Sequence, residues 1–551
     1  MGFFDDHRDM LVQALQAARS RGYWSAFPEV PSGKIYGERA KADGEAAFAG
    51  LLDRPFQIDQ PSNGWVGREI SPLGKPLGIT YPKSEPAALI GAARNAGRAW
   101  AAASIEERVG VALEMLARIN KQSFLFGNAV MHTSGQAFPM AFQAGGPHAQ
   151  DRGLEAVAYA YDEMTRVPRQ ARWEKPQGKN PSLLLDKAYR IVPRGIALVI
   201  ACATFPTWNS YPGLFASLVT GNAVIVKPHP QAILPLALTV RIGRDVLREA
   251  GFDPNVLLLA ADEPDAPIAK ELALDPAIGI VDFTGSPVFG RWLRENVRHA
   301  VLFTEEAGVN SVVIDSTDDF AGMCQNLAFS LSLYSGQMCT APQNIYVPRN
   351  GMDTDEGRKS FDEVAAGIAG AIDALLSDPV RAANVLGAIQ SEDTLKRIEA
   401  ARCLGRIVRD SKALDGAGSA RTATPLIVAV DAADEQAYLE ERFGPISFVI
   451  AVASAEEAVA RAARSAKEKG AITAALYSTN EALIDGASGA FAAAGVALSV
   501  NLTGGIYVNQ SAAFSDYHVT GANPAGTACF TDSAFVTNRF HIATMRRPMA
   551  A

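Results

Sequence analysis

Short apolar strands that alternate with helices are the feature that constrains this chain most. A helix expected over residues 235–250 lies between two of these strands, and Gly251 and Pro254 end it. The strands expected in this half of the chain are 196–203, 224–226, 256–259 and 278–283. Strands that read as continuous apolar runs are buried on both faces, as in a parallel sheet covered by crossover helices. The alternation therefore predicts an α/β fold.

A second alternating region begins near Phe303 and predicts a second domain. Its expected strands are 312–314, 345–347, 426–430, 448–452 and 474–477. A chain of 551 residues is also too long for one hydrophobic core. We therefore expect a Rossmann-type dinucleotide-binding domain over residues 61–302 and an α/β catalytic domain over 303–510, although the GxGxxG fingerprint is missing.

Three further segments are expected around these domains. Residues 1–60 form an N-terminal extension with a mixed helical pattern, to which no chemistry is assigned. A polar, proline-containing stretch followed by an apolar strand predicts an arm around residues 166–190 that leaves the first domain. Residues 511–551 are expected to return to the cofactor domain or to an interface between subunits.

Composition and charge exclude several classes of function. The net charge of −8 and the scattered basic residues argue against nucleic acid as a partner. Five widely spread cysteines, without CxxC or paired Cys/His spacing, favour neither a disulfide framework nor a metal site. The N-terminus lacks the apolar core of a signal peptide, and the longest apolar runs are shorter than the ~20 residues of a membrane span. We expect a soluble protein of a reducing cytoplasm, with no membrane partner.

The pentapeptide GQMCT, Gly336 to Thr340, contains the candidate nucleophile Cys339. A thiol attacks a carbonyl as its thiolate, and a helix continuing from Thr340 would lower the pKa of the thiol through its N-terminal dipole. Glu305 is the upstream carboxylate that would activate water to hydrolyse the resulting thioester. The alternatives are an inert buried thiol for Cys339 and a solvated loop acid for Glu305, as for its neighbour Glu306.

Several motifs occur in one order along the chain, and together they resemble those of the aldehyde dehydrogenase superfamily. Besides GQMCT, they are GNAVIVKP (221–228), FTGSPVFG (283–290), EERFGP (440–445), the GxxxVN-like strand GIYVN (505–509) and FSDYHVTG (514–521). The likeness runs from about Ser71 to Asn538. Within the superfamily, the N-terminal extension and EEAGVN (305–310) resemble the PaaN-type proteins of aromatic-acid degradation.

The resemblance implies a cofactor site. Lys227 would contact the adenosine ribose, and Gly285 with Ser286 would face the pyrophosphate. Glu441 would accept from the nicotinamide ribose hydroxyls. Phe443 would pack near the nicotinamide, with simple core packing as the alternative.

The choice between the two nicotinamide cofactors depends on one departure from the family. NAD-preferring relatives carry a glutamate shortly after the lysine, and Pro230 stands at that position. A carboxylate there would repel the 2′-phosphate of NADP, so its absence predicts NADP as cofactor, with NAD as the alternative.

The resemblance also implies the catalytic groups. Cys339 would form the thioester and Glu305 would direct the hydrolytic water. Phe514 would line the aldehyde tunnel or, alternatively, anchor its loop. The oxyanion asparagine of the family corresponds in spacing to Thr204, which offers a hydroxyl. Asn209 lies further along, where we expect a helix, and we interpret it as a coincidental match.

The predicted function is oxidation of an aldehyde to a carboxylate through a Cys339 thioester. From the PaaN-type likeness, the substrate would be a semialdehyde carrying a CoA thioester. One rival is a CoA-acylating dehydrogenase, which has no need of a base such as Glu305. Another is a non-catalytic binding or scaffold protein on the same fold, suggested by Thr204 and opposed by the retained Cys339 and Glu305. In the family that the chain resembles, the matching arm builds oligomers, so the resemblance implies a homodimer or homotetramer.

Overall fold

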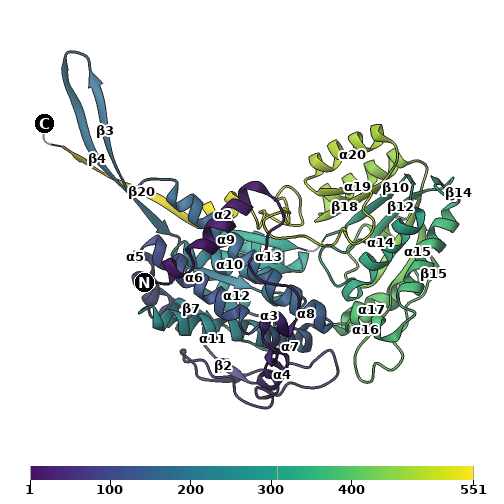
Figure 1. Cartoon of the computed structure of the whole chain (residues 1–551), viewed down its shortest axis with the longest axis horizontal. Coiled ribbons are helices and arrows are strands. Elements are labelled where there is room, and N and C mark those ends of the chain that lie inside the picture. The colour runs from purple at the N-terminus through teal and green to yellow at the C-terminus, as the bar shows by residue number, and fades with distance from the viewer. Residues whose placement is uncertain (1, 307, 550–551) are drawn as a thin grey trace.

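The computed structural model describes residues 2–306 and 308–549 and contains two α/β domains that lie side by side, with a projecting arm (Figure 1). The first domain is built on a five-stranded parallel sheet. In spatial order its strands are β7 (Leu257–Leu259), β6 (Ala223–Lys227), β5 (Ile196–Ile200), β8 (Ile278–Gly285) and β9 (Val301–Glu306). From β5 the chain adds strands first on one side, as β6 and β7, and then on the other, as β8 and β9. The carboxyl ends of β5 and β8, where this direction reverses, form the crevice at which open α/β sheets bind ligands.

Helices cover both faces of this sheet because its side chains alternate between two cores. One core contains α6 (Ile105–Asn120), α9 (Pro147–Thr165), α10 (Pro206–Val219) and α11 (Leu234–Glu249). The other contains α12 (Ala269–Leu274) and α13 (Pro287–Asn296), and α5 (Pro86–Ala102) contributes to both. α7 (Ser123–Ser134) and α8 (Phe138–Gly145) extend the first of these layers.

The second domain has a seven-stranded sheet that is parallel except for one edge strand. In spatial order the strands are β15 (Arg406–Arg409), β16 (Leu426–Asp431), β17 (Ile446–Val452), β12 (Asn344–Pro348), β10 (Ser311–Ile314), β18 (Thr473–Tyr477) and β19 (Ala497–Val500), with β15 antiparallel. One face packs on α14 (Phe320–Ser332) and α15 (Phe361–Leu375). The other packs on α17 (Glu392–Ala401), α19 (Ala455–Lys469) and α20 (Glu481–Ala494).

The alternation in the sequence predicted these sheets closely. Every expected strand of both regions coincides with an observed one, and the helix expected over 235–250 is α11. The strand expected over 196–203 ends earlier, at Ile200, and from there the chain enters the candidate site. The predicted division at residue 303 falls inside β9, which pairs with β8 and therefore belongs to the first sheet. The GIYVN motif at 505–509 lies in turns and coil and not in a strand.

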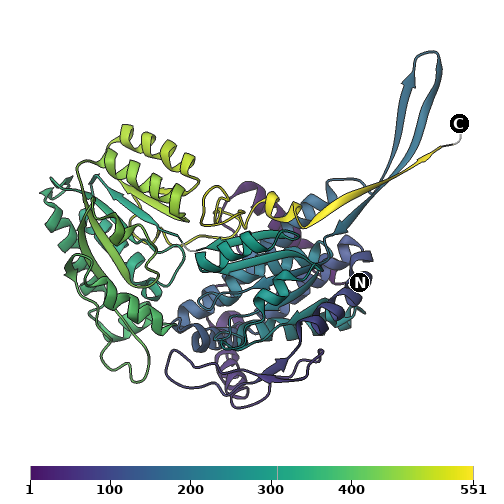
Figure 2. The same cartoon turned by 180° about the vertical axis from the view of Figure 1, so that it is seen from behind.

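The N-terminal extension packs on the first domain, which is the expected cofactor domain. It contains α1 (Phe3–Asp6), α2 (Arg8–Ser20), α3 (Gly33–Tyr36) and α4 (Ala40–Ala49). The apolar face of α2 joins the core that contains α6 and α9 through Leu11, Ala14 and Ala17. Beyond α2 the chain continues beside the loop near the C-terminus, and both views show this purple segment next to the yellow one (Figures 1 and 2).

The arm is a three-stranded antiparallel sheet that projects from the cofactor domain (Figure 2). The hairpin of β3 (Gln170–Gln177) and β4 (Asn180–Pro193) is completed by the C-terminal strand β20 (Phe540–Pro548). Its side chains are largely exposed, including Leu183 and Met545. Oligomer formation through this arm stays a prediction. Among the described residues, none of the helices combines the length and the apolar character needed to span a membrane.

Arg539 joins the C-terminal segment to the cofactor sheet just before β20. Its guanidinium donates to both carboxylate oxygens of Asp282 on β8, at 2.6 and 2.8 Å, and to the hydroxyl of Ser217 at 2.7 Å. The guanidinium also lies 4.3 Å from the ring centre of Phe303 and 4.1 Å from that of Phe535. Arg539 is fully buried, so this ion pair fixes the path of the chain between site and arm.

We expect Arg539→Ala to lower the free energy of unfolding by about 3–5 kcal/mol, because the Asp282 carboxylate would remain buried without its partner. Urea unfolding followed by fluorescence measures the change. The matched control is Arg546→Ala, since Arg546 lies exposed on β20. Equal unfolding midpoints for the two variants would contradict a stabilising role for the ion pair.

Candidate active site

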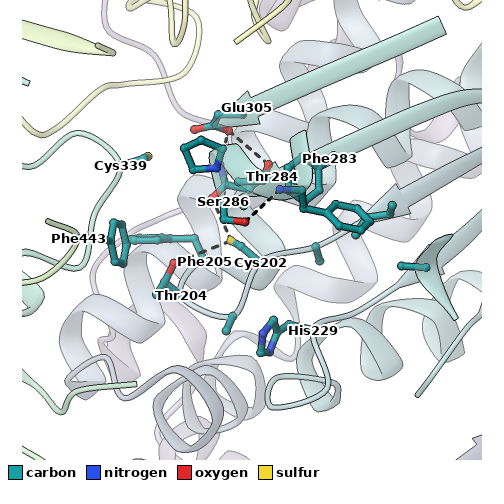
Figure 3. Close-up of a pocket in the computed structure, with 18 of the residues that line it drawn as sticks. Cys202, Thr204, Phe205, His229, Phe283, Thr284, Ser286, Glu305, Cys339 and Phe443 are labelled. Atoms are coloured by element: carbon teal, nitrogen blue, oxygen red, sulfur yellow. Dashed lines mark hydrogen bonds between the residues drawn. The ribbon is translucent and has the colours of Figure 1, made fainter. Parts of the chain in front are cut away.

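A cavity of about 490 Å³ opens at the carboxyl ends of the cofactor strands and is closed on its other side by the second domain. It brings together residues that are far apart in the sequence. The predicted site residues on its wall are Thr204, Lys227, Gly285, Ser286, Glu305, Cys339, Glu441 and Phe443. Figure 3 shows Cys339 and Phe443 on one side of this space and Thr284 with Ser286 on the other.

Cys339 lies in a turn, and the chain continues from it into strand β12. The predicted helix after Thr340 is therefore wrong, and the dipole expected from it does not act on this thiol. Side-chain bonds hold the turn instead: Asn310 Nδ2 donates to the carbonyl of Cys339 at 2.7 Å, and Thr340 Oγ1 donates to the carbonyl of Asn509 at 2.8 Å. Asn310 thus fixes the backbone of Cys339 itself, and Asn509 fixes the residue that follows it.

The backbone before the nucleophile is unusual. Tyr334, Ser335 and Gly336 have φ angles of 52°, 51° and 62°, a left-handed run that costs energy for the two residues with side chains. A Cβ at residue 336 would lie 2.6 Å from the carbonyl oxygen of Gly444, so only glycine fits. The Ser335 hydroxyl stabilises this conformation with bonds to two backbone carbonyls, at 3.0 and 3.1 Å.

The surroundings of Cys339 favour its neutral thiol. Loss of hydration raises the pKa of the Cys339 thiol well above its usual value, and the nearby Glu305 carboxylate raises it further by repelling a thiolate. This direction is opposite to the one expected from the sequence. The thiol must therefore lose its proton during the reaction or on a change of the site.

Glu305 is fully buried on β9, and three side chains bond to its carboxylate, with Thr284 Oγ1 donating to Oε2 at 3.4 Å. Asn209 Nδ2 donates to Oε2 at 2.6 Å, and His518 Nε2 lies 2.8 Å from Oε1. The ligand-type atoms of Glu305, Cys339 and His518 all lie within 4.8 Å of one another. The acid and the thiol that the sequence paired thus lie close together, and their catalytic roles stay predictions. The neighbouring Glu306 is not a solvated acid, since it is buried and paired with Arg294.

Sequence reasoning missed the roles of Asn209 and His518. Asn209 is in α10, as expected, but its side chain reaches the cavity and the base, so treating it as a coincidence was wrong. His518 stands inside the FSDYHVTG motif, where a histidine was the available signal. Neither position is close to Glu305 along the chain, so only the fold reveals these contacts.

Thr204 follows β5 and lines the cavity, as its spacing predicted. Gln136 Nε2 donates to its carbonyl at 2.8 Å, which fixes its backbone. Its hydroxyl lies 3.9 Å from Cys202 Sγ, a second thiol on the same wall. Thr204 is thus close to the reacting region, and its use as an oxyanion donor stays a prediction.

Lys227 ends β6 and forms an ion pair with a residue that the sequence argument overlooked. Its Nζ lies 2.6 Å from Oδ1 of Asp262, which follows β7. Loss of hydration lowers the pKa of Lys227 and raises that of Asp262, and their mutual attraction opposes both shifts. The argument for NADP assumed that no carboxylate lies beside this lysine. That premise is wrong, because the neighbouring strand supplies Asp262.

Gly285 and Ser286 lie where β8 gives way to α13. Ser286 is the N-cap of this helix, and its Oγ accepts from the backbone N–H of Phe289 at 3.4 Å. The free N–H groups and the dipole of a helix N-terminus suit a phosphate group. This position at the sheet crevice, with Lys227 on an adjacent wall, fits the pyrophosphate and ribose of a dinucleotide.

Glu441 and Phe443 reach the cavity from the second domain. Loss of hydration raises the pKa of Glu441 to about 8, and Arg397 opposes the shift. Arg397 Nε also donates to the carbonyl of Phe443 at 3.1 Å, so one guanidinium organises both residues. Both residues line the same cavity as Ser286, and their place at the nicotinamide end of a cofactor stays a prediction.

Phe514 does not lie on the cavity wall. It is fully buried in the core of the cofactor domain, and its ring meets Trp24 of the N-terminal extension edge-on, with ring centres 5.0 Å apart. The prediction that it lines an aldehyde tunnel does not match this packing. The alternative considered from the sequence, a loop anchor, describes it.

The chain is similar to known proteins over most of its length. The model of the aldehyde dehydrogenase family matches residues 80–522. An N-succinylglutamate 5-semialdehyde dehydrogenase of Paraburkholderia xenovorans (strain LB400) is 30% identical over 380 residues, which cover 67% of this chain and 72% of that protein. The crystal structure of an NAD-dependent aldehyde dehydrogenase from Burkholderia multivorans has 57% identity and a TM-score of 0.98 over 100% of both chains. A Thermus 1-pyrroline-5-carboxylate dehydrogenase with bound NAD shares the fold at 19% identity, with a TM-score of 0.73 over 96% of this chain and 99% of that one.

The raised pKa of Cys339 predicts a pH dependence in the cofactor-free protein. Below that pKa the thiolate fraction grows tenfold per pH unit, so iodoacetamide should alkylate Cys339 about tenfold faster per unit from about pH 6.5 to about pH 9. Glu305→Gln removes the repelling charge and should speed alkylation at neutral pH. Peptide mass spectrometry follows Cys339, with the exposed Cys403 as internal reference. A rate that levels off near neutral pH would contradict the raised pKa.

Proposed function

The chain belongs to the aldehyde dehydrogenase family, and we propose that it oxidises a semialdehyde to a carboxylate, with NAD as the hydride acceptor. The observation that carries this proposal is the meeting of Cys339 and Glu305 beside a dinucleotide-sized cavity. The proposal includes the order of steps and the role of each side chain.

The first half of the reaction uses the thiol. Cys339 gives its proton to solvent and its sulfur adds to the aldehyde carbon, which gives an oxyanion that the Cys339 backbone N–H and the Thr204 hydroxyl would stabilise. When bound, the nicotinamide accepts the hydride that leaves this carbon. A thioester on Cys339 results.

The second half uses the carboxylate. Glu305 takes a proton from water, the water oxygen adds to the thioester carbon, and the Cys339 sulfur leaves as the acid is released. A buried carboxylate this close to the thiol has a clear use in hydrolysis. Transfer of the acyl group to CoA would need no such base, so the geometry favours hydrolysis over CoA acylation.

NAD is the cofactor that the charges favour. Asp262 lies against Lys227, the residue proposed to contact the adenosine ribose. A carboxylate there can accept from a ribose 2′-hydroxyl and repels a 2′-phosphate. The Burkholderia multivorans protein that this chain resembles along its whole length is described as NAD-dependent.

Two semialdehyde classes are candidates for the substrate. The extension and the EEAGVN segment favour a CoA-linked semialdehyde of aromatic-acid catabolism. The Paraburkholderia xenovorans relative, named for N-succinylglutamate 5-semialdehyde, favours a free, amino-acid-derived semialdehyde. Apolar side chains dominate the cluster between the cavity and the Cys339 turn, including Phe205, Tyr334 and Met338. Such a wall suits an uncharged carbon chain next to the aldehyde and thus supports the CoA-linked class, whose charges lie far from the reacting carbon.

The roles of the two catalytic side chains are tested by Glu305→Gln. This variant should release about one NADH per active site in a rapid burst and then turn over at least ~100-fold more slowly than wild type, because only hydrolysis needs the base. Stopped-flow absorbance measures both phases. Cys339→Ala should show neither phase, while Cys403→Ala should match wild type. Disappearance of the burst in Glu305→Gln would mean that Glu305 acts before hydride transfer.

Cofactor preference is tested at Asp262. Wild type should have the higher kcat/KM with NAD, and Asp262→Asn should raise the NADP to NAD ratio of kcat/KM at least ~10-fold by removing the repulsion. Asp265→Asn is the matched control, since Asp265 is exposed and pairs with Arg68 at the surface. A wild-type preference for NADP would refute the assignment.

The substrate class is tested by comparing kcat/KM for a straight-chain semialdehyde as its CoA thioester, the same chain as a free acid, and N-succinylglutamate 5-semialdehyde. We expect the CoA thioester to exceed the other two by at least ~10-fold, which corresponds to about 1.4 kcal/mol of extra transition-state binding. Free CoA is added to a further set of assays. An acyl-CoA product in that set would overturn the hydrolytic proposal, and a lead for the succinylglutamate compound would assign the second class.

A further inference from the structure

The base Glu305 is bonded at Oε2 by two side chains of its own domain, Asn209 and Thr284, and at Oε1 by one side chain from a distant loop. Asn209 comes from α10, whereas His518 belongs to the coil that runs from residue 511 to residue 532. In the tautomer that carries the proton on Nε2, His518 donates to Oε1 at 2.8 Å and is itself 2% exposed. A carboxylate bonded at one oxygen only can rotate, so His518 decides how Glu305 faces Cys339.

The loop that carries His518 is strained on both sides of it. Phe514 and Val519 have φ angles of 62° and 60°, and a left-handed conformation is a true outlier for β-branched valine. Such residues cost of order 1–3 kcal/mol each and persist only where surrounding contacts fix them. Val519 packs with Ile472 and Ala525, in a small cluster that also contacts Cys339.

Contacts with the N-terminal extension fix the other end of the loop. Arg21 Nε donates to the carbonyl of Ser515 at 3.2 Å, and the Ser515 hydroxyl donates back to the carbonyl of Arg21 at 3.1 Å. The Arg21 guanidinium lies 4.0 Å from the ring centre of Tyr517, and Trp24 meets the ring of Phe514. The extension thus contacts three of the four residues that precede His518.

The cofactor domain also contacts the loop that carries His518. Arg152 of α9 is 2% exposed, donates to the hydroxyl of Ser511 at 2.9 Å and to the carbonyl of Asp516 at 3.3 Å, and lies 5.2 Å from the ring centre of Trp208. Trp208 in turn meets the His518 ring edge-on, with ring centres 4.7 Å apart. The imidazole therefore has little freedom once the loop is seated.

We propose that His518 is a positioning residue for the base Glu305, and that Arg21 and Trp24 of the N-terminal extension hold the loop that places it there. The extension then serves hydrolysis of the thioester, although none of its residues from 2 to 60 lines the cavity. The inference rests on the proposed function, because it assumes that Glu305 acts after the hydride has left.

The test separates the two halves of the reaction. His518→Ala should keep a full NADH burst at the wild-type rate and lower the steady-state rate ~10- to 100-fold, the size expected when a reacting group is misplaced by about 1 Å. His518→Gln retains a donor of similar reach and should recover most of that loss. Assays contain EDTA, because Glu305, Cys339 and His518 are also a ligand set that a stray zinc ion would bind.

The extension is tested by Arg21→Ala and Trp24→Leu, each of which should lower the steady-state rate with an unchanged burst. Arg19→Ala and Tyr23→Ala are matched controls, since these neighbours are 69% exposed as a side chain and 81% exposed as a residue. In a His518→Ala background, Arg21→Ala should cause no further loss, because its effect acts through His518. Circular dichroism and gel filtration verify folding, and Arg21→Lys is used should Arg21→Ala not fold.

The outcomes distinguish this inference from the proposed function. A wild-type steady state in His518→Ala, with Glu305→Gln still stalled after its burst, overturns the inference alone. Equal losses of burst rate and steady-state rate in His518→Ala would assign it a general structural role and also overturn the inference. Loss of the burst in Glu305→Gln overturns the order of steps, and the proposed function with it.

Discussion

A carboxylate buried without contact with solvent has to be held by donors, and Glu305 is held by donors from three parts of the chain that meet only in the folded protein. Its strand, β9, sits at the edge of the cofactor sheet and ends beside the catalytic domain. α10 brings Asn209 to one oxygen and the C-terminal loop brings His518 to the other. The packing of the two domains, the C-terminal loop and the N-terminal extension together determine the surroundings of Glu305.

Enclosure of the site has opposite effects on its two reacting groups. It removes water that would compete for the thioester, which favours a single hydrolytic water placed by Glu305. It also raises the pKa of the Cys339 thiol, so the nucleophile is stored in its less reactive form. The left-handed run at 334–336 and the bonds of Asn310 compensate in part, because they present the sulfur in one fixed geometry.

At the cofactor end of the cavity, two neighbouring strands each supply one charged side chain. Lys227 and Asp262 follow two adjacent parallel strands, so their side chains meet at the same edge of the sheet. In the proposed site the lysine would supply a donor and the aspartate an acceptor for a ribose. The strand beside that of the lysine thus provides a carboxylate that the inference from Pro230 did not take into account.

The sequence by itself predicted the two α/β sheets and singled out Cys339, Glu305 and most of the residues that line the cavity, because apolar periodicity and short motifs are local signals. It misjudged the helix after Thr340 and the packing of Phe514, set Asn209 aside, and overlooked Asp262 and His518. Each of these depends on which distant side chain arrives at a given point. Tertiary structure alone decides that, since the pKa of a thiol, the charge beside a ribose and the orientation of a carboxylate are set by contacts between segments that lie far apart in the chain.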